Sequence, residues 1–374
     1  MVEWKKICEV SKRNKGIPIT AGQMNELNSP SGNVRVFAAG KTLADIDENK
    51  LPANCAIRTP SIIVKSRGYI DFDFYEKPFT HKNEMWSYSF ENKEQCKFIY
   101  YYLTTKTDFF RNKAKANSVK LPQLCVADTD NFIIPFPPVS EQQRIVEKLD
   151  TFTSSIENLK ELIAQRRKQY EYYRDQLLDI EGKEGVEMRN ISDVAKSFTG
   201  LTYKPENVSD EGTLVLRSSN IDEDILAFED NVFVQMVIPE RAIVKENDIL
   251  ICVRNGSKRL VGKAAMITKK AEGMAFGAFM TILRSFDIDS KFLFYVWQSE
   301  KVKKQYKGDE AMPIAQITSK DFQRIIIPVP SLSEQQRIVS ILDTFEASIQ
   351  NLEAQLKLRE KQYEYYRNKL LTFE

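Results

Sequence analysis

Histidine is almost absent from this sequence, and its cysteines form no pattern; both shortages exclude classes of protein. The 374 residues include one histidine, His81, and five cysteines, none of them in a Cys-x-x-Cys pair. A single histidine removes most histidine-based metal sites, and a Ser-His-Asp triad would have to use His81. An odd number of dispersed cysteines also argues against a disulfide framework or a zinc ribbon. The composition therefore favours a binding protein over a hydrolase.

The sequence also lacks long apolar runs and a strong charge of either sign. Its longest apolar runs, such as 249–253 and 325–327, are far shorter than the roughly 20 residues of a membrane span. The first ten residues, MVEWKKICEV, have no apolar core of a signal peptide, so we expect a cytoplasmic protein. The net charge of +2 is too small to indicate a nucleic-acid partner by itself, and only local clusters can do so.

Sequence motifs of common enzymes are missing as well. The chain contains no G-x-x-x-x-G-K-[ST] phosphate loop, no G-x-G-x-x-G after a strand and no H-E-x-x-H zinc motif. It also lacks the N/D-P-P-Y/F motif of amino-methyltransferases, and its carboxylates match no metal-binding spacing. The missing motifs make an enzyme less expected, although they do not exclude one.

What the sequence does contain is an internal repeat. Residues 140–178 and 333–371 align without a gap and are identical at 25 of 39 positions. The sequences between the two repeats look unrelated, apart from short landmarks. This arrangement is expected if the shared segments perform one task twice while the variable domains perform two different tasks. We divide the chain into a first variable domain, a first shared segment, a second variable domain and a second shared segment, at 1–139, 140–181, 182–332 and 333–374.

The shared segments carry the signals of two long helices. Ser140 with Gln143, and Ser333 with Gln336, follow prolines and predict a capping box at each helix start. Apolar residues then recur at alternating spacings of four and three, the seam of a left-handed coiled coil. We expect the two helices to pair with each other as an antiparallel coiled coil with pseudo-twofold symmetry. The seam residues expected at the helix-pair interface are Ile145, Leu149, Phe152, Ile156, Leu159, Ile338, Leu342, Phe345, Ile349 and Leu352.

Two features of these helices allow more than one explanation. Arg166 and Arg359 interrupt the seam at equivalent positions, either to fix the register of the pair or to contact a partner subunit. The motif Tyr-Glu-Tyr-Tyr-Arg occurs at 170–174 and at 363–367. We interpret its tyrosines as packing residues where a helix end meets a domain.

The two variable domains are expected to be α/β (α+β), with much strand. Residues 61–76, around Arg67-Gly68, predict a β-hairpin. Residues 248–267 predict another, with Asn255-Gly256 as a two-residue type I′ turn. Helices are expected at about 93–112 and 289–306. The whole chain is then two variable domains separated by two long helices.

Basic residues concentrate in the second predicted hairpin. Residues 251–270 contain six Lys or Arg and no acid, so the hairpin offers contacts to phosphates and to base edges. A solvated charged surface is the competing explanation for any single residue, and His81 by itself is more often structural. The candidate DNA-binding residues are Arg254, Asn255, Ser257, Lys258, Arg259, Arg217, Ser218 and Asn220 in the second domain, and Lys65, Arg67, Lys82 and Asn83 in the first.

These features together resemble the specificity subunit of type I restriction-modification systems, over essentially the whole chain. The resemblance is carried by IIPxPxxSEQQRIV, which occurs twice, and by HKNEMWSYS, LRSSNI, DILICVRNGSKRLVGKA and FGAFMTILRS. It implies that each variable domain is a target recognition domain, which reads one half of a bipartite, asymmetric site in double-stranded DNA. The paired helices would set the spacer between the half-sites and dock two adenine-N6 methyltransferase subunits.

The same resemblance places all chemistry on other chains. The methyltransferase subunits would bring S-adenosylmethionine, and restriction or translocase subunits, where present, would use ATP and Mg²⁺. This chain would supply sequence choice alone. The alternatives are a coiled-coil scaffold without a role on DNA, and a nuclease or methyltransferase with unrecognised motifs.

Overall fold

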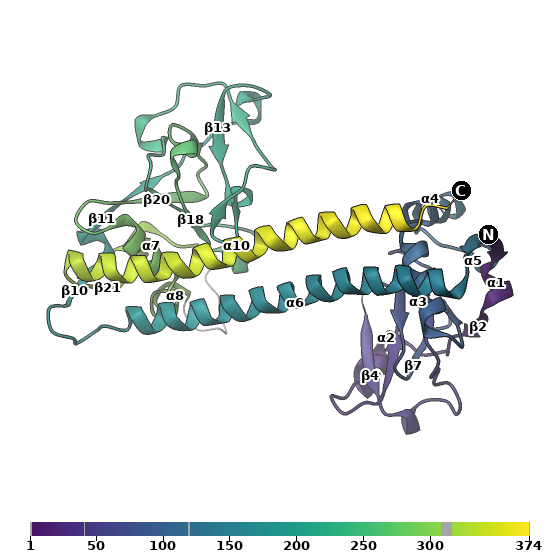
Figure 1. Ribbon diagram of the computed structural model, residues 1–374. Coiled ribbons are helices and arrows are strands. Elements are labelled where there is room, and N and C mark those ends of the chain that lie inside the picture. The colour runs from purple at the N-terminus through teal and green to yellow at the C-terminus, as the bar shows by residue number, and fades with distance from the viewer. Residues whose placement is uncertain (1, 41, 119, 308–315, 374) are drawn as a thin grey trace. The chain divides into compact units, whose positions relative to one another are not determined.

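The computed structural model describes residues 2–40, 42–118, 120–307 and 316–373. The chain divides into two compact units: unit 1 comprises Met1–Lys160 and Ala354–Glu374, and unit 2 comprises Glu161–Glu353. Two long helices, α6 (Val139–Leu178) and α10 (Leu332–Leu370), each contribute residues to both units (Figure 1). In the part of the chain that the structure describes, no helix has the length and apolar character that spanning a membrane requires.

Unit 1 is built around two small sheets. The four-stranded antiparallel sheet has the order β2-β8-β5-β6, formed by Lys12–Lys15, Trp86–Ser89, Ser61–Lys65 and Asp71–Tyr75. The three-stranded sheet has the order β4-β3-β7, formed by Leu43–Ile46, Val34–Phe37 and Phe79–His81. Strand β1 (Glu3–Lys6) pairs with β9 (Ile133–Phe136), which leads into α6. The shorter helices are α1 (Ile7–Val10), α2 (Ala21–Leu27), α3 (Lys93–Thr104), α4 (Thr107–Asn117) and α5 (Val126–Asp130).

Unit 2 has the same kinds of parts. Its four-stranded antiparallel sheet has the order β11-β20-β17-β18, formed by Ala195–Thr199, Met280–Ser285, Ile249–Cys252 and Ala264–Met266. A second sheet has the order β12-β16-β13-β19, formed by Val208–Ser209, Phe233–Val234, Thr213–Leu216 and Ala275–Phe276. The remaining strands are β10 (Glu187–Asn190), which pairs with β21 (Ile326–Val329), and the hairpin β14 (Ile221–Asp222) and β15 (Ile225–Leu226). The shorter α-helices are α7 (Ser290–Gln298), α8 (Glu300–Lys307) and α9 (Ser319–Phe322).

The two variable domains share one topology, which their sequences did not reveal. The order β2-β8-β5-β6 in unit 1 matches β11-β20-β17-β18 in unit 2, and β3 runs parallel to β7 as β13 does to β19. A glycine marks the same close backbone approach in each domain. A Cβ atom on Gly16 would lie 2.2 Å from the carbonyl oxygen of Lys82, and one on Gly200 would lie 2.1 Å from that of Gly277. The internal repeat therefore extends through the domains.

The predicted antiparallel helix pairing is confirmed within each unit. In unit 1 the ring of Phe152 on α6 stacks on Tyr366 of α10, with centroids 5.3 Å apart. In unit 2 the repeat-equivalent pair, Tyr173 of α6 and Phe345 of α10, stacks at 5.4 Å. A second contact gives the direction within each unit: Lys160 pairs with Glu360 in unit 1, and Arg167 pairs with Glu353 in unit 2. In both units the residue numbers on α10 fall as those on α6 rise, so the helices are antiparallel.

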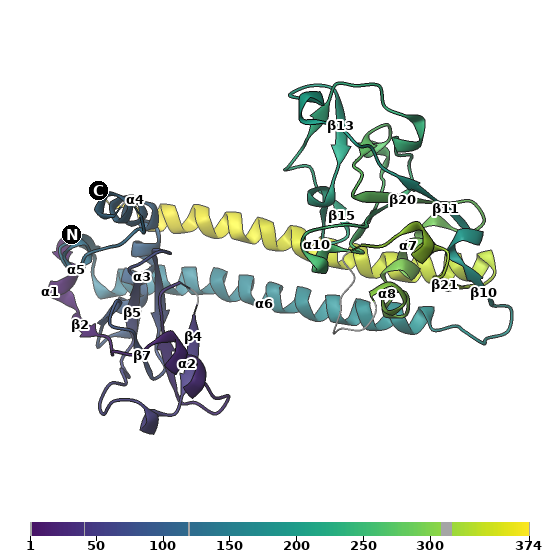
Figure 2. The ribbon, with the colours of Figure 1, turned by 180° about the vertical axis from the view of Figure 1, so that it is seen from behind.

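The outer ends of the predicted seam also belong to the domain cores. Ile145 and Leu149 are fully buried in one apolar cluster with α3 and with Leu371, which follows α10. Ile338 and Leu342 are buried in the same way beside α7 (Figure 2). The inner seam residues are half-buried, namely Ile156, Leu159, Ile349 and Leu352. Each long helix is therefore a layer of a domain as well as one member of a pair.

The helix starts differ from the predicted capping boxes. Helix α6 begins one residue before Ser140, and α10 begins one residue before Ser333. The neighbouring glutamine closes each start instead: the Gln142 amide donates to the Pro137 carbonyl at 2.8 Å, and that of Gln335 donates to the Pro330 carbonyl at 2.9 Å. The capping-box prediction was therefore wrong in its residues, although the helices are present.

Three further expectations need correction. The stretch 248–267 does form antiparallel strands, but residues 253–263 join them as a long loop, and neither Asn255 nor Gly256 has the positive φ of a type I′ turn. The helix expected at 93–112 is two helices, α3 and α4, and the one expected at 289–306 is α7 and α8. The packing expected of the tyrosine motif is found only in part: Tyr170 is buried and the rings of Tyr173 and Tyr366 stack on the opposite long helix, whereas Tyr172 and Tyr365 are exposed.

Candidate nucleic-acid interface

Three loops of unit 2 lie together at the ends of neighbouring strands, and they hold the residues predicted to bind DNA. The first follows β13, the second follows β17 and the third follows β19. We name them loops A, B and C; they comprise residues 217–220, 253–263 and 277–279.

Backbone hydrogen bonds fix these loops against one another. The N–H group of Gly277 donates to the carbonyl of Leu216 at 2.9 Å, which joins loop C to the strand before loop A. The N–H groups of Val253 and Arg254 both donate to the carbonyl of Phe279, at 3.0 and 3.2 Å. Loop B is therefore held to loop C at the point where the basic residues begin.

Three basic side chains of loop B are exposed. Arg254, Lys258 and Arg259 are exposed, as is Ser257 between them. Within the described part of the chain, no carboxylate forms an ion pair with any of the three basic residues. The Arg254 guanidinium instead lies over the ring of Phe279, with 5.3 Å between its carbon and the ring centroid. The N–H groups of these three exposed basic side chains are available to an anionic ligand.

Loop A is more constrained. The guanidinium of Arg217 pairs with Asp230 at 2.9 Å and is half-buried. The Ser218 hydroxyl accepts a hydrogen bond from the Asn255 amide at 3.0 Å, which joins loops A and B through side chains. These residues lie within the candidate surface, but part of their hydrogen-bonding capacity is already used.

Asn220, another candidate DNA-binding residue, has a position that does not fit contact with DNA. Asn220 is fully buried. Its amide oxygen accepts from the Arg217 N–H at 2.9 Å, and its amide nitrogen donates to the carbonyl of Ala227 at 3.0 Å. The side chain therefore shapes loop A from within.

Unit 1 places an arginine at the same structural position as Arg254. Arg67 follows β5 as Arg254 follows β17, and each forms an isolated antiparallel bridge with a glutamine: Arg67 with Gln123, and Arg254 with Gln316. Arg67 is also exposed, and the described residues include no acid paired with it. The two domains therefore present equivalent exposed guanidinium groups.

The other candidates of unit 1 differ from their counterparts in unit 2. Lys65 pairs with Asp73 at 2.7 Å, and Lys82 pairs with Glu84 at 3.0 Å. Asn83 is exposed in the loop after β7. The surface around Arg67 in the first domain is thus more acidic than the surface around Arg254 in the second.

His81, next to this surface, is structural. It is fully buried, and its Nε2 lies 3.2 Å from the Ser87 hydroxyl while Nδ1 lies 3.3 Å from the Lys82 carbonyl. Burial lowers the pKa of His81 to about 4, so the imidazole is neutral at physiological pH. The residue therefore supports the loop that carries Lys82.

Sequence reasoning missed two features of this interface. Phe279 was not selected, although it lies in the segment FGAFMTILRS that carries the family resemblance. The equivalence of Arg67 and Arg254 was hidden because loops of different length separate them from the recognisable landmarks. The only sequence signal was weak: Gln123 and Gln316, the bridge partners of the two arginines, occupy equivalent positions just upstream of the two repeats.

A repeated polar contact attaches each variable domain to a long helix. In unit 1 the hydroxyl of Tyr101 on α3 donates to Asp150 of α6 at 2.6 Å. In unit 2 the hydroxyl of Tyr295 on α7 donates to Asp343 of α10 at 2.5 Å. A lysine from the same domain helix pairs with each aspartate, Lys97 at 2.5 Å and Lys291 at 2.7 Å. Both domains are therefore oriented on their helices by the same chemistry.

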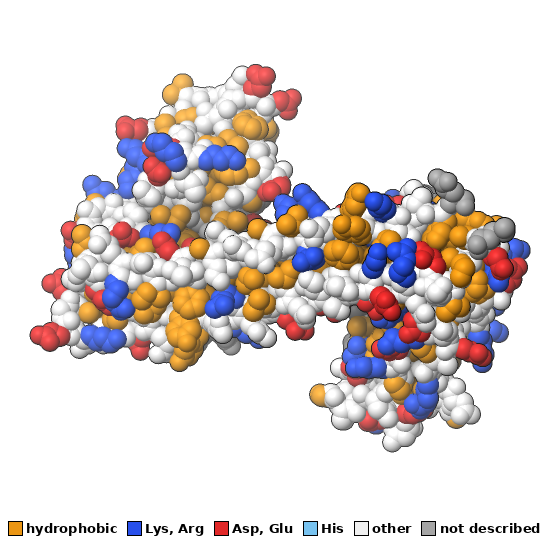
Figure 3. All heavy atoms as spheres, viewed as in Figure 1, with side chains coloured by type: hydrophobic (Ala, Val, Ile, Leu, Met, Phe, Trp, Pro, Cys, Tyr) orange, Lys and Arg blue, Asp and Glu red, His pale blue; other side chains and the backbone are white. Residues whose placement is uncertain are grey.

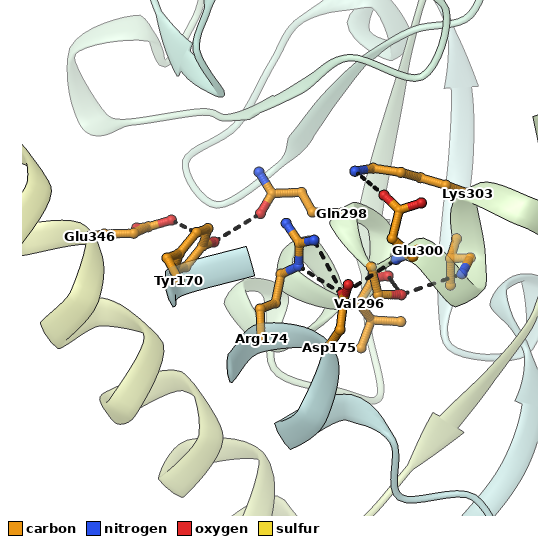
Figure 4. Close-up of polar contacts among 10 residues, drawn as sticks. Tyr170, Arg174, Asp175, Val296, Gln298, Glu300, Lys303 and Glu346 are labelled. Atoms are coloured by element: carbon orange, nitrogen blue, oxygen red, sulfur yellow. Dashed lines mark hydrogen bonds and ion pairs between the residues drawn. The ribbon is translucent and has the colours of Figure 1, made fainter. Parts of the chain in front are cut away.

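Unit 2 has a second polar network at this junction (Figure 4). The buried hydroxyl of Tyr170 on α6 lies 3.2 Å from Gln298 of α7 and 3.3 Å from Glu346 of α10. Burial raises the pKa of both Tyr170 and Glu346. Arg174 bonds to Asp175 at 3.2 Å, and Asp175 accepts from the N–H of Glu300 at 3.4 Å. The second domain is thereby tied to both long helices.

The long helices expose the same residues twice. Some aligned positions carry the same residue in both copies and are exposed in both copies. Most of these positions lie in the first turn of each helix or in and next to the tyrosine motif. They are Ser140, Gln143, Arg144, Thr151, Asn158, Lys168, Glu171, Tyr172 and Tyr173, matched by Ser333, Gln336, Arg337, Thr344, Asn351, Lys361, Glu364, Tyr365 and Tyr366. Exposed positions between these clusters mostly differ, for example Gln165 against Leu358.

Because the helices are antiparallel, each unit gathers one full set of these residues. Unit 1 takes the first half from α6 and the tyrosines from α10; unit 2 does the reverse. Figure 3 shows hydrophobic side chains exposed along both helices. We name each set, in its unit, the repeated helix surface.

The structure also bears on metal binding. Among the described residues, no group of three or more His, Cys, Asp or Glu side chains is placed to hold a metal ion.

Comparison with known proteins assigns the chain to a family. The model of the type I restriction modification DNA specificity domain matches residues 1–165 and again residues 183–359. The specificity subunit of the Escherichia coli type I restriction enzyme EcoR124I/EcoR124II is 28% identical, over 100% of this chain and 94% of its own length. A putative type I specificity subunit of Mycoplasma pneumoniae is 25% identical, over 99% of this chain and 96% of its own.

Solved structures share the fold. The S subunit of a type I restriction-modification system from M. genitalium superimposes with a TM-score of 0.60, at 18% identity, over 100% of this chain and 97% of that one. A chain from a structural study of type I system assembly gives a TM-score of 0.58, at 18% identity, over 99% and 96%.

Proposed function

We propose that this chain, which belongs to the type I restriction-modification specificity subunit family, reads a two-part DNA sequence with its two variable domains. The observation that supports this most is the pair Arg67 and Arg254, which are exposed, structurally equivalent and not ion-paired with any acid that the structure describes. An arginine at such a position can bind the O6 and N7 atoms of guanine in the major groove. Two domains that each carry such an arginine read two half-sites.

The surroundings of the two arginines support an asymmetric target. Arg254 stands beside Phe279, Asn255 and two further exposed cations, whereas Arg67 shares its surface with the ion pair of Lys82 and Glu84. Base edges differ in their donors, acceptors and methyl groups, so different side chains select different bases. The two half-sites should therefore differ in sequence.

We further propose that the repeated helix surface of each unit docks one adenine-N6 methyltransferase subunit. Exposed residues that only face water are free to diverge, and the exposed positions between the clusters have done so. Exposed tyrosines are favoured at interfaces because they combine a large apolar ring with a polar tip. Two identical surfaces on one chain fit two copies of one partner.

In this proposal the chemistry belongs to the partners. The methyltransferase subunits carry S-adenosylmethionine, and restriction subunits, where present, use ATP and Mg²⁺. The chain supplies sequence choice, in the cytoplasm where chromosomal DNA is modified.

The DNA-reading part is tested by mapping N6-methyladenine in cells that express the chain with its methyltransferase. Arg254→Ala should relax one base position in one half-site, since a bidentate arginine–guanine contact contributes about 1–3 kcal/mol of discrimination. Arg67→Ala should relax a position in the other half. The control is Arg58→Ala, since Arg58 is exposed but pairs with Glu48 at 2.6 Å outside the loops. Equal loss of both half-sites in either variant would contradict the proposal.

The docking part is tested by stoichiometry. Replacing Tyr172 and Tyr173 by alanine should reduce the complex from two methyltransferase subunits to one, measured by native mass spectrometry, and so should replacing Tyr365 and Tyr366. Leu358→Gln is the matched control, because this exposed apolar residue is glutamine in the other copy. Two subunits bound to both double variants would show that the tyrosines are not the docking surface.

A further inference from the structure

Loop C of unit 2 holds a large apolar side chain on the candidate DNA surface. Phe279 is 58% exposed, although it lies between two strands whose other residues are mostly buried. Its position is fixed by the backbone: its carbonyl accepts from Val253 and Arg254, and the Met280 N–H donates to the carbonyl of Gly277 at 2.9 Å. The ring is therefore presented to solvent by a rigid turn.

The side chain of Arg254 packs against the Phe279 ring and so limits which DNA groups the ring can contact. The Arg254 guanidinium lies over one face of the ring, 5.3 Å from its centroid. A side chain that wedges between base pairs stacks a base on each face. Phe279 has one face covered, so its free edge and second face are suited to a lateral contact in a groove.

Base chemistry then identifies the ligand. Guanine offers two acceptors to an arginine in the major groove, and thymine alone of the four bases offers an apolar group there, its 5-methyl group. Since ring and guanidinium stand side by side, they fit a thymine adjacent to a guanine. Building on the proposed function, we propose that Phe279 reads the 5-methyl group of a thymine in the half-site of the second domain, next to a guanine bound by Arg254.

The first domain has different chemistry at the equivalent position. Glu84 precedes β8 as Phe279 precedes β20, and its carbonyl accepts from Ser66, the residue before Arg67, at 2.5 Å. Its carboxylate is paired with Lys82. A carboxylate cannot make an apolar contact with a methyl group, so the thymine contact belongs to the second half-site only.

The test uses the complex of this chain with its methyltransferase subunits. A library of random-sequence duplexes yields the bound consensus, and synthetic duplexes then replace each thymine of that consensus singly with deoxyuridine, which lacks only the methyl group. We expect one thymine next to a guanine, in one half-site, where the replacement weakens binding about fourfold, the effect of one buried methyl group.

Variants assign that effect to the ring. Phe279→Ala should weaken binding to the thymine duplex and remove the difference between thymine and deoxyuridine, whereas Phe279→Leu should retain part of it. The control is Phe286→Ala: Phe286 is also 58% exposed but follows the opposite end of β20. In this variant the difference should persist.

The outcomes separate the two claims. A sequence-specific complex that is insensitive to deoxyuridine at every thymine would overturn the role of Phe279 and leave the proposed function intact. So would a thymine preference that Phe279→Ala leaves unchanged. A complex that selects no consensus would contradict both.

Discussion

Acid should weaken unit 1 through its single histidine. The neutral imidazole of His81 is fully buried, and burial lowers its pKa from 6.5 to about 4. In the unfolded chain the same imidazole takes up a proton near its ordinary pKa. Between these two values only the unfolded chain binds the proton, so lowering the pH favours unfolding.

The loss in free energy of unfolding follows from the difference between the pKa of His81 in the folded chain and in the unfolded chain. A difference of about 2.5 pKa units corresponds to about 3 kcal/mol. This stabilisation is complete above pH 6.5 and is lost as the pH falls from 6.5 towards 4, with about 2 kcal/mol already lost at pH 5. The polar neighbours of the ring are a serine hydroxyl and a backbone carbonyl, and no carboxylate among the described residues pairs with the imidazole to stabilise its charged form.

Two measurements check this prediction. Because His81 is the only histidine of the chain, its ring resonances in an NMR titration are unambiguous, and they should stay those of a neutral imidazole down to about pH 5. Urea unfolding of the chain between pH 5 and 7 should show the loss, and His81→Phe should reduce it. Phenylalanine is the residue that the second domain carries at the equivalent buried position, Phe276. A resonance that titrates near pH 6.5, or an equal pH dependence in the variant, would refute the reasoning.

Three substitutions test other parts of the structure. Asn220→Ala should lower the free energy of unfolding by about 1–3 kcal/mol in urea denaturation, because it leaves buried backbone groups of loop A unpaired; weaker DNA recognition at unchanged stability would contradict its structural role. Gly200→Ala should lower the melting temperature, since the new Cβ would lie 2.1 Å from the Gly277 carbonyl oxygen, and an unchanged value would disprove that close approach. Tyr295→Phe should cost about 1 kcal/mol in urea denaturation by removing the donor to Asp343, whereas full stability would show that Lys291 satisfies this carboxylate alone.

Patterns with a fixed period were predictable from the sequence. The spacing of the apolar residues gave both long helices and their antiparallel pairing, since a seam that recurs twice in one chain needs a partner. Their starts were misplaced by two residues, since Ser140 and Ser333 were predicted to precede the first turn and instead lie inside it. Gln142 and Gln143 are adjacent, and the sequence does not tell which of them closes that turn.

Features that depend on burial were not predictable. Asn220 and Asn255 are both asparagines in polar segments, yet one is inside the domain and the other joins two loops. The tyrosines of the repeated motif suit a buried junction as well as an exposed surface, and only the fold separated Tyr170 from Tyr172 and Tyr173.

The loops between landmarks hid the common topology of the domains. Equivalent strands share apolar character but few identical residues, so Arg67 and Arg254 become a pair only when their bridges to Gln123 and Gln316 are seen. Phe279 was passed over because an exposed phenylalanine has no sequence signature.

The central claim is that this chain chooses the DNA sequence that its partners modify. Its most direct test is to express the methyltransferase subunit in a host without other DNA methylation, with and without this chain, and to map N6-methyladenine across the genome. The account predicts one bipartite, asymmetric methylated motif that disappears when the chain is omitted. A motif that persists without the chain, or a folded complex that methylates no defined sequence, would contradict it.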